Sequence, residues 1–525
     1  MAILLETRAR NVVPRWRDFQ TTVQLGELGA EHPSREASPH VDLTPLVSAW
    51  EAHHGLSFAG DLISAALVNN LPDLARDASK FVLEFGERAS ASLRLMATHV
   101  LGGLEGPAML MMTEPVITTP ESSRQPSPAI ARAKKELGSR PNNAILWMDL
   151  AYLYAVRGLA AQAERAIRIA LQLAPSNRFV LRSAARFLVH QDRLDEAHAL
   201  IRRAPGVRTD PWLLSAEIAI SMAAESTPFF SKAGVTMLAA ANFSDRQLSE
   251  LSSAIGTLEA SHGNTRKAKR HLRNSLIDPT DNSLAQATWL SENGNGIELQ
   301  ISEDDYDLER GFEARAYRGF AASQWKESLG SSLQWIKDQP FSSRAVRSAS
   351  FLANSIFQDH DLAETIIKFG QISNPHDPAF HVGLAYAYAR RDRLDDSVAE
   401  LKKISSANNE VWLPAALDAN YGLISYRRGQ FLEGRQLYAL ATKKADKLDD
   451  KRTKVAALTN WAMEEMKYSR EMALSIIQEA QETAKRATGP DVPFTIERVL
   501  KALETSKDEP HNGDKIFNVD EVRPH

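Results

Sequence analysis

Apolar residues recur at spacings of three and four along most of the chain, which is the period of a helix with one buried face. The first such stretch covers residues 41–106 and includes Leu46, Trp50 and Leu62. A second stretch runs from residue 141 to 290, and a third runs from 309 to 487. The pattern predicts an all-α fold.

Four stretches interrupt this pattern and divide the chain. Residues 1–40 have little helical period and carry three prolines, which predicts an irregular N-terminal arm. Residues 107–140 include the run TEPVITTPESSRQPSP and predict a linker rich in Pro, Ser and Thr. Residues 291–308 contain ENGNG and EDDYD and predict a second linker, acidic and glycine-containing. Residues 488–525 predict a capping helix followed by a disordered tail.

A repeat of about 34 residues is visible inside the helical stretches. Counted from Ala144, large residues alternate with small ones at fixed positions, and a glycine and a proline mark the turns: Trp147, Leu150, Ala151, Tyr154, Gly158, Ala163, Ile167, Ala170 and Pro175. The next unit starts at Arg178 and repeats the series with Leu181, Ala184, Ala185, Leu188, Ala197, Ile201 and Ala204. Small residues opposite large ones let two antiparallel helices pack closely. Each unit therefore predicts a helical hairpin.

Further units follow the same order of small and large residues. They begin near Ser249, Pro378, Ala415 and Lys454. We therefore expect two arrays of hairpins, at residues 141–290 and 309–487. Residues 41–106 are either divergent repeats or a separate docking region, and the sequence does not decide between the two.

On these residues the chain resembles the tetratricopeptide repeat family over about residues 141–487. The resemblance implies a right-handed solenoid of helical hairpins, preceded here by a divergent helical region. It also implies a concave groove, lined by the first helix of each pair, that holds a peptide or a helix of a partner protein. The family's groove positions, carried over by register, nominate Met148, Tyr152, Arg182, Arg186, His190, Tyr386, Arg390, Leu423, Tyr426 and Arg427.

The nominated residues are rich in Tyr and Arg, a mixture that suits an extended acidic peptide. A different interpretation needs no ligand. Arg390 and Arg427 lie near the predicted C-terminal ends of their helices, where a cation is favourable beside the helix dipole. The tyrosines can equally pack inside their own repeats.

The N-terminal arm contains the run RNVVPRWRDFQ, in which Arg15, Trp16 and Arg17 place cations on both sides of an aromatic ring. Segments of this kind dock on partners or touch nucleic acid. The alternative is an arm that packs on the chain's own first helices through Trp16 and Phe19.

Composition narrows the possible functions. The chain has no cysteine, which excludes disulfides, thiolate zinc sites and cysteine nucleophiles. Its 62 basic and 66 acidic residues give a net charge of -4, too small to draw the whole chain onto nucleic acid. The N-terminus lacks a signal-peptide core, and no apolar stretch is long enough to span a bilayer. Complete catalytic, phosphate-loop or metal motifs are absent, so we expect no enzyme, no cofactor and no metal site.

We therefore expect a cytoplasmic scaffold or adaptor of bacterial type, which binds a protein partner within a multiprotein assembly. An enzyme or an ATPase is one candidate partner, and neither a membrane nor nucleic acid is expected. The alternative is a nucleic-acid-binding or regulatory sensor protein built on a helical repeat array. That alternative predicts a continuous basic stripe in the groove, and Glu250, in the unit that begins near Ser249, argues against it.

Overall fold

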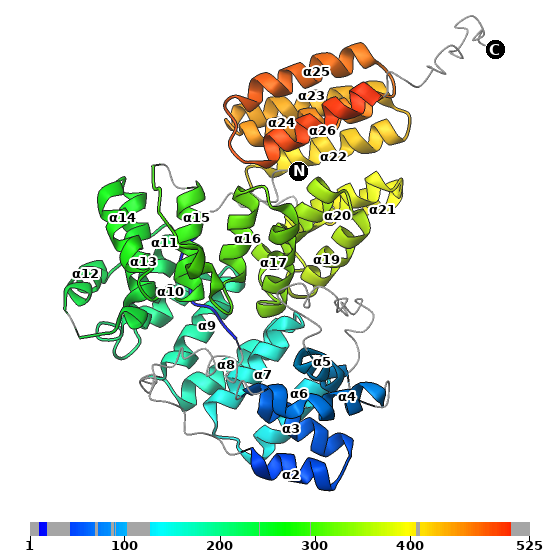
Figure 1. The fold of residues 1–525 in the computed structure, drawn as a ribbon. Helices are drawn as coiled ribbons and strands as arrows, with labels where there is room; N and C mark the ends of the chain where they lie inside the picture. Colours follow the sequence, from blue (N-terminus) through cyan, green and yellow to red (C-terminus); the bar gives the residue numbers. More distant parts are fainter. Residues whose placement is uncertain are drawn as a thin grey trace, which may run out of the picture. The chain divides into compact units, whose positions relative to one another are not determined.

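The computed structural model describes residues 10–17, 43–68, 72–85, 89, 91–101, 127–240, 242–293, 296–405 and 410–505. Within these ranges every regular element is a helix (Figure 1), which confirms the all-α prediction. The chain divides into two compact units. The smaller comprises Gly29–Val116, and the larger comprises Met1–Leu28 together with Ile117–His525.

The described residues of the smaller unit form four α-helices and one 3-10 turn around a core of their own. The elements are α2 (Thr44–Ala52), α3 (Leu56–Val68), η2 (Pro72–Ala75), α4 (Arg76–Glu84) and α5 (Ala91–Val100). Trp50 anchors the core, with its ring 5.1 Å from that of Phe81 in an edge-to-face contact. These helices fall inside the predicted helical region 41–106, whose role in docking stays a prediction.

The larger unit is a succession of helical hairpins. The first helices of the pairs are α7 (Ala144–Val156), α9 (Arg178–His190), α11 (Pro211–Ala223), α13 (Asp245–Ser261), α16 (Phe312–Ala321), α18 (Ser343–Phe351), α20 (Pro378–Arg390), α22 (Leu413–Arg427) and α24 (Lys451–Glu465). The second helices are α8 (Ala160–Leu173), α10 (Leu194–Arg202), α12 (Ser231–Ala239), α14 (Thr265–Asn274), α17 (Trp325–Asp338), α19 (His360–Ser373), α21 (Leu394–Lys402), α23 (Phe431–Lys447) and α25 (Arg470–Ala484).

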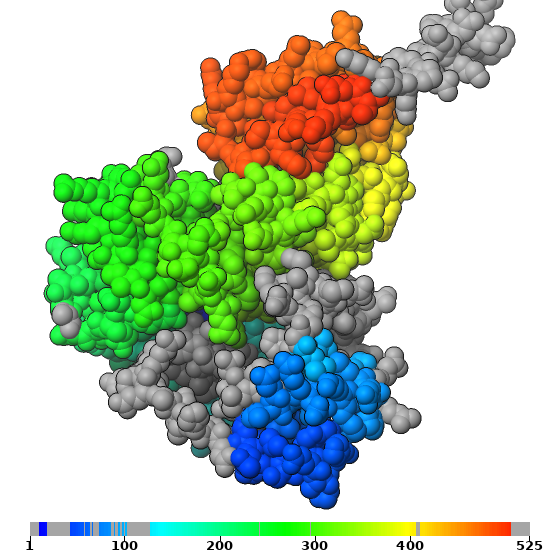
Figure 2. Space-filling view, in the orientation of Figure 1, coloured from blue at the N-terminus to red at the C-terminus, as the bar shows by residue number. Residues whose placement is uncertain are grey.

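The described residues of this unit form three further α-helices. α6 (Pro128–Ser139) precedes the first pair, and α26 (Asp491–Thr505) follows the last. α15 (Asp281–Asn293) lies between α13 and α16 and is followed by a 3-10 turn, η6 (Glu303–Asp307). We call the surface formed by α15 and the first helices of the pairs the first-helix face. The side chains of α23–α26 form one continuous block in Figure 2.

The turn has the same backbone geometry in all hairpins except the pair formed by α24 and α25. A residue just after the first helical stretch adopts a left-handed conformation, with positive φ, in eight hairpins: Gly158, Asp192, Glu225, Gly263, Ser323, Gln358, Asp392 and Gly429. In the pair formed by α18 and α19, this residue comes after a π-helical turn, η7 (Leu352–Phe357). A left-handed residue ends a helix and reverses the chain, so the repeat is visible in the backbone as well as in the sequence.

The predicted register holds where the repeat is clearest. Ala144, Arg178 and Pro378, each taken as the start of a unit, are the first residues of α7, α9 and α20. Asn143 and Asn177 cap the first two of these helices with their side-chain oxygens. The small residues Ala151, Ala163 and Ala170 are fully buried between α7 and α8, as close packing of a hairpin requires.

The structure differs from the predicted divisions at two places. The last part of the expected linker 107–140 is the helix α6, which starts at Pro128 because a proline is accepted at the first position of a helix. The expected linker 291–308 contains the turn η6, whose Tyr306 is buried. The predicted capping helix corresponds to α26. The rest of the linker, residues 107–126, and the tail after 505 lie outside the described residues, as does Phe19.

Every helix in the described ranges is too short or too polar to cross a lipid bilayer.

Candidate functional site

Residues 10–17 form an extended segment on the first-helix face of the larger unit. In Figure 1 this segment is the dark blue stretch beside α9. It forms no helix, and two side chains of α15 donate hydrogen bonds to its backbone. The side chain of Asn282 donates to the carbonyl oxygen of Val13 at 3.0 Å, and that of Gln286 donates to the carbonyl oxygen of Arg10 at 2.8 Å. Asn282 and Gln286 are one helical turn apart, so α15 grips the backbone of the segment at two points.

Three arginines of the segment enter a buried acidic site. The Arg10 guanidinium donates to both oxygens of Glu313, from Nε at 2.8 Å and from Nη2 at 3.0 Å. Arg15 pairs with Asp281 and, through Nη2 at 2.5 Å, with Glu313. Arg17 pairs with Asp281 at 2.5 Å and with Asp338 at 2.6 Å. We call the set Glu250, Asp281, Asn282, Gln286, Glu313 and Asp338 the inner site.

The remaining carboxylate of the inner site is paired within the array. Glu250, on α13, accepts a hydrogen bond from Arg182 Nη2 at 2.6 Å and another from the Asn282 side chain at 3.3 Å. Because Asn282 also holds Val13, the pair formed by Arg182 and Glu250 is connected to the segment through one amide. Arg310 donates to Asp338 at 3.1 Å from the opposite side.

The arginines of the segment control the ionisation of these buried acids. Burial alone would raise the pKa of Glu313, but Arg10 and Arg15 outweigh burial and hold that pKa below its usual value. Asp281 is governed in the same way: burial raises its pKa, and Arg15 and Arg17 lower it further than burial raises it. Glu250 differs, because burial is the larger effect and its pKa is raised despite Arg182. The charged state of the site therefore depends on the guanidinium groups of the segment.

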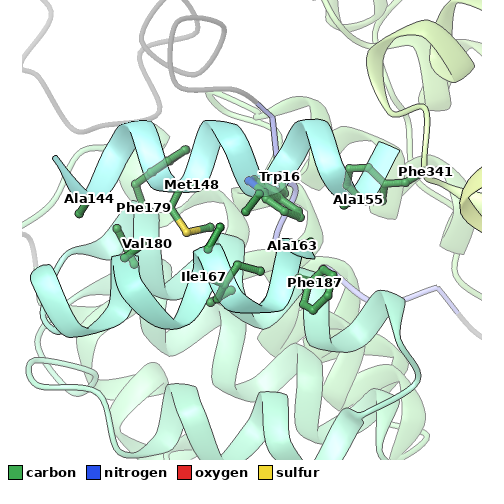
Figure 3. Close-up of a cluster of buried hydrophobic side chains, with 14 residues drawn as sticks. Trp16, Ala144, Met148, Ala155, Ala163, Ile167, Phe179, Val180, Phe187 and Phe341 are labelled. Carbon is green, nitrogen blue, oxygen red and sulfur yellow. The ribbon is translucent and has the colours of Figure 1, made fainter. Parts of the chain in front are cut away.

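Trp16 fills an aromatic pocket next to the acidic site. Its ring lies edge-on to Tyr152 at 5.5 Å and to Phe187 at 6.2 Å, and it is tilted against Phe341 at 5.7 Å. Figure 3 shows Trp16 among the labelled side chains of α7, α8 and α9. The Trp16 side chain is 1% exposed, and its Nε1 makes no hydrogen bond with a described residue. The pocket therefore holds the indole through ring contacts and exclusion of water.

The first five residues nominated from the repeat register surround this segment. Met148 is completely buried in the core that contains Trp16, and Tyr152 contacts the Trp16 ring. Arg182 pairs with Glu250 and lies over the ring of Trp212 at 4.8 Å. Arg186 and His190 both face Phe341, at 5.2 Å and 5.3 Å. Burial lowers the pKa of Arg186 to about 10 and, together with Arg186, lowers the pKa of His190 to about 4.

The other nominated residues lie on α20 and α22 and contact α24. The Tyr386 hydroxyl donates to Asn460 at 3.0 Å, and the Tyr426 hydroxyl donates to Glu465. Arg390 and Arg427 share one acceptor, Glu464, at 3.1 Å and 3.0 Å. Leu423 is buried in the same region. The arginines expected to receive an acidic peptide thus already have carboxylate partners in the chain, and binding of a partner by these residues stays a prediction.

The arm residues nominated for docking lie in the interior of the larger unit. The Arg15, Trp16 and Arg17 side chains are 6%, 1% and 1% exposed, and their partners are residues of the chain itself. Trp16 does contact first helices, as the packing alternative expected. In this arrangement the three side chains are not accessible to a partner, and docking by other parts of the arm stays a prediction.

Most of the acidic side of the inner site has no signal in the repeat pattern. The repeat register points to Glu250 but not to Asp281, Glu313 or Asp338. Asp281 begins α15 two residues after Pro279, a position that a helix-start search could have found. Glu313 and Asp338 gave no signal, because their partners in the segment are about 300 positions away.

The inner site combines four carboxylates with two amides, and all of these side chains except Glu250 contact residues 10–17. Within the described ranges, no three His, Asp or Glu side chains come together as ligands for a metal ion.

The hairpins, their left-handed turns and their buried small residues make this chain a tetratricopeptide-like helical repeat protein. No protein-family model and no curated protein matches it. Comparison with solved structures finds chains that are similar at low sequence identity and low TM-score, three of which follow. Yeast Tom70 is 12% identical over 86% of this chain and 96% of its own, with a TM-score of 0.29. A tetratricopeptide repeat protein from Parabacteroides merdae is 13% identical over 62% and 99%, with a TM-score of 0.24. Human IFIT1, solved as a dimer with PPP-AAAA, is 11% identical over 92% and 99%, with a TM-score of 0.31.

Proposed function

We propose that this chain is a non-catalytic scaffold that binds a protein partner on its first-helix face, as part of a cytoplasmic multiprotein assembly. The observation that carries the proposal is the way residues 10–17 are held. An extended peptide lies on the first-helix face, its carbonyls gripped by Asn282 and Gln286 and its Trp16 ring enclosed by aromatic side chains. Recognition of an extended segment by side chains of a groove is how peptide-binding proteins work.

The hydrogen bonds and charges on this face favour a protein ligand. The amides recognise backbone carbonyls, which every peptide offers, and the carboxylates recognise cationic side chains. Phosphate groups would be repelled by Asp281, Glu313 and Asp338, all of which are buried in the site. An enzyme or an ATPase is a suitable partner, since a scaffold of this kind contributes binding and leaves the chemistry to others.

The test is affinity purification of the intact, tagged chain from its native cells, with quantitative mass spectrometry of the proteins that accompany it. We expect a reproducible set of partners. The variant Arg390→Ala with Arg427→Ala should recover these partners at least fivefold less well. Its fold should persist, because Glu464 keeps Lys467 as a partner at 3.0 Å.

The matched control is Arg428→Ala, since Arg428 is exposed and pairs only with the exposed Asp395 among the described residues. This control should recover the same partners as the unmodified chain. Absence of any reproducible partner would contradict the scaffold proposal. Unchanged recovery with the double variant would contradict binding at α20 and α22.

One observation favours a second candidate function, binding of nucleic acid. The helix α14 (TRKAKRHLRN) contains five cations and no acid: Arg266, Lys267, Lys269, Arg270 and Arg273. None of them forms an ion pair with a described residue, and α14 is a second helix, outside the first-helix face. Phosphate backbones bind such surfaces in a salt-dependent way. Weakening of binding to a labelled 20-nucleotide RNA or DNA by Arg270→Glu with Arg273→Glu, measured by fluorescence anisotropy in 50 mM salt, would support this function. No measurable binding by the unmodified chain would exclude it.

A further inference from the structure

We propose that the inner site is a receptor for an extended, arginine-containing segment of a protein partner, and that residues 10–17 occupy this receptor in cis until the partner's segment displaces them. The inference rests on the proposed scaffold function and specifies the class of ligand. It replaces the acidic peptide expected from the sequence with a basic one.

The inner site selects guanidinium groups over other cations. Glu313 receives two parallel hydrogen bonds from Arg10, and Asp338 receives hydrogen bonds from both Nε and Nη2 of Arg17. An arginine fork matches a carboxylate in this way, whereas the ammonium group of lysine cannot. The side chains of Arg10 and Glu313 are 3% and 4% exposed, so water cannot replace a lost hydrogen bond at this pair. The ligand class is therefore a segment with two or three arginines.

The spacing of the contacts defines the rest of the ligand. Two backbone carbonyls, three residues apart on the segment, are held by Asn282 and Gln286. An aromatic ring lies between the last two arginines and enters the pocket formed by Tyr152, Phe187 and Phe341. A partner segment that fits must be extended and must carry an aromatic residue next to an arginine.

Residues 10–17 resemble a bound peptide ligand, because their contacts come from parts of the chain that are distant in sequence. The segment has no secondary structure of its own, and side chains of α15, α16 and α17 supply its polar contacts. Each of its ion pairs with a described residue joins positions 264 to 321 apart in the sequence. The hairpins themselves pack through the repeat positions, such as Ala151 against Ala163 and Ala170, which the segment does not provide.

The inner site favours exchange of one basic segment for another over standing empty. Without the arginines of the segment, Asp281 would lose its ion pairs with Arg15 and Arg17, and Glu313 would keep Arg344 at 3.9 Å. Buried acids with so little compensation are strongly unfavourable. A covalently attached segment competes at an effective concentration in the millimolar range. Only a partner with the same charges and with further contacts elsewhere on the chain would displace it, and this competition makes access to the site selective.

The test uses the full-length chain and a fluorescein-labelled synthetic peptide of residues 8–19. The peptide is titrated into the unmodified chain and into the variant Arg15→Ser with Trp16→Ser, whose own segment is weakened. We expect the variant to bind the peptide at least tenfold more tightly, because the competing segment no longer fits. A peptide in which Arg10, Arg15 and Arg17 are all lysine should bind the variant at least tenfold more weakly.

A third variant locates the binding to the inner site. Adding Asp338→Asn to Arg15→Ser with Trp16→Ser should reduce affinity for the peptide at least fivefold. Failure of the folded double variant to bind the peptide would overturn the proposal and make residues 10–17 a permanent part of the core. Equal binding of the lysine peptide would overturn the assignment of a guanidinium ligand.

If the double variant does not fold, the unmodified chain provides the second measurement. It is incubated with excess peptide that carries the photo-crosslinking residue p-benzoylphenylalanine at position 16. Crosslinks from this peptide to chain fragments containing Tyr152 or Phe341 would support exchange, and their absence after prolonged incubation would overturn it. Either result leaves the partner purification as a separate test, so the ligand class and the scaffold function can fail independently.

Discussion

Arg10 and Glu313 are 303 positions apart in the sequence and form a buried bidentate ion pair. The pair joins the N-terminal segment to α16, and Arg15 shares the same carboxylate. Removing Arg10 would leave Glu313 with Arg15 and the more distant Arg344, so the buried carboxylate would be less well compensated. Ion pairs therefore attach the N-terminal segment to the middle of the repeat array.

The effect of removing Arg10 on stability should depend on whether Glu313 is present. We expect Arg10→Met to lower the free energy of unfolding by about 3 kcal/mol, because Glu313 loses a buried partner. In a chain that already carries Glu313→Gln, the same change should cost about 1 kcal/mol. Urea unfolding followed by circular dichroism measures both values. Equal effects of Arg10→Met in the two backgrounds would show that the residues do not interact.

The turn at Gly158 should tolerate no side chain. Its φ is +69°, and a Cβ atom there would collide with the carbonyl oxygen of Ile372 on α19. Gly158→Ala should therefore destabilise the chain by about 3 kcal/mol, from the left-handed backbone and from the collision together. Gly429→Ala is the matched control, with φ of +80° and no atom within 4 Å of the added Cβ, and it should cost only about 1 kcal/mol. If Gly158→Ala and Gly429→Ala lowered stability by similar amounts, the Ile372 carbonyl could not lie next to the turn at Gly158.

Stability should fall with acidification between about pH 6.5 and pH 4. Burial and the neighbouring Arg186 lower the pKa of His190 to about 4, while the Ser373 carbonyl opposes them. In this window the unfolded chain binds a proton at His190 that the folded chain does not, so lowering the pH favours unfolding, by up to about 3 kcal/mol. His360, with a pKa of about 4, contributes in the same direction.

Replacement of His190 isolates its share of this pH dependence. His190→Gln should remove about half of the loss of stability between pH 6.5 and pH 4, as measured by urea unfolding at several pH values. His262→Gln changes an exposed histidine at the end of α13 and should leave the dependence as it was. Identical pH profiles for the unmodified chain and His190→Gln would refute the assignment.

The hairpins were predictable because their signals are local. The starts of α7, α9 and α20 follow from small and large residues spaced within one repeat, and Gly158 marks its own turn. The helix α6 was missed because Pro128 was counted with the prolines of a linker, although it stands at the first position of the helix. The turn η6 was not predicted, because its run of acidic residues is typical of an exposed loop although Tyr306 within it is buried.

The sequence predicted some of the repeat residues around the candidate site but not the segment that occupies it. The repeat register nominated Tyr152, Arg182 and Arg186, which do lie around the segment. The register carries no information about an occupant, so the path of Arg10–Arg17 could not be inferred. The pairing of Arg17 with Asp338 depends on how the array brings distant helices together, and a single sequence does not contain that arrangement in any local pattern.

The position of the N-terminal segment is tested most directly by finding what the side chain at position 16 touches in the intact chain. Trp16 is replaced by p-benzoylphenylalanine, and a mixture of chains labelled with nitrogen-14 and nitrogen-15 is irradiated and digested. We predict crosslinks from position 16 to fragments containing Tyr152, Phe187 or Phe341, within single chains. Absence of crosslinks to all three fragments would contradict the claim that the N-terminal segment occupies the first-helix face.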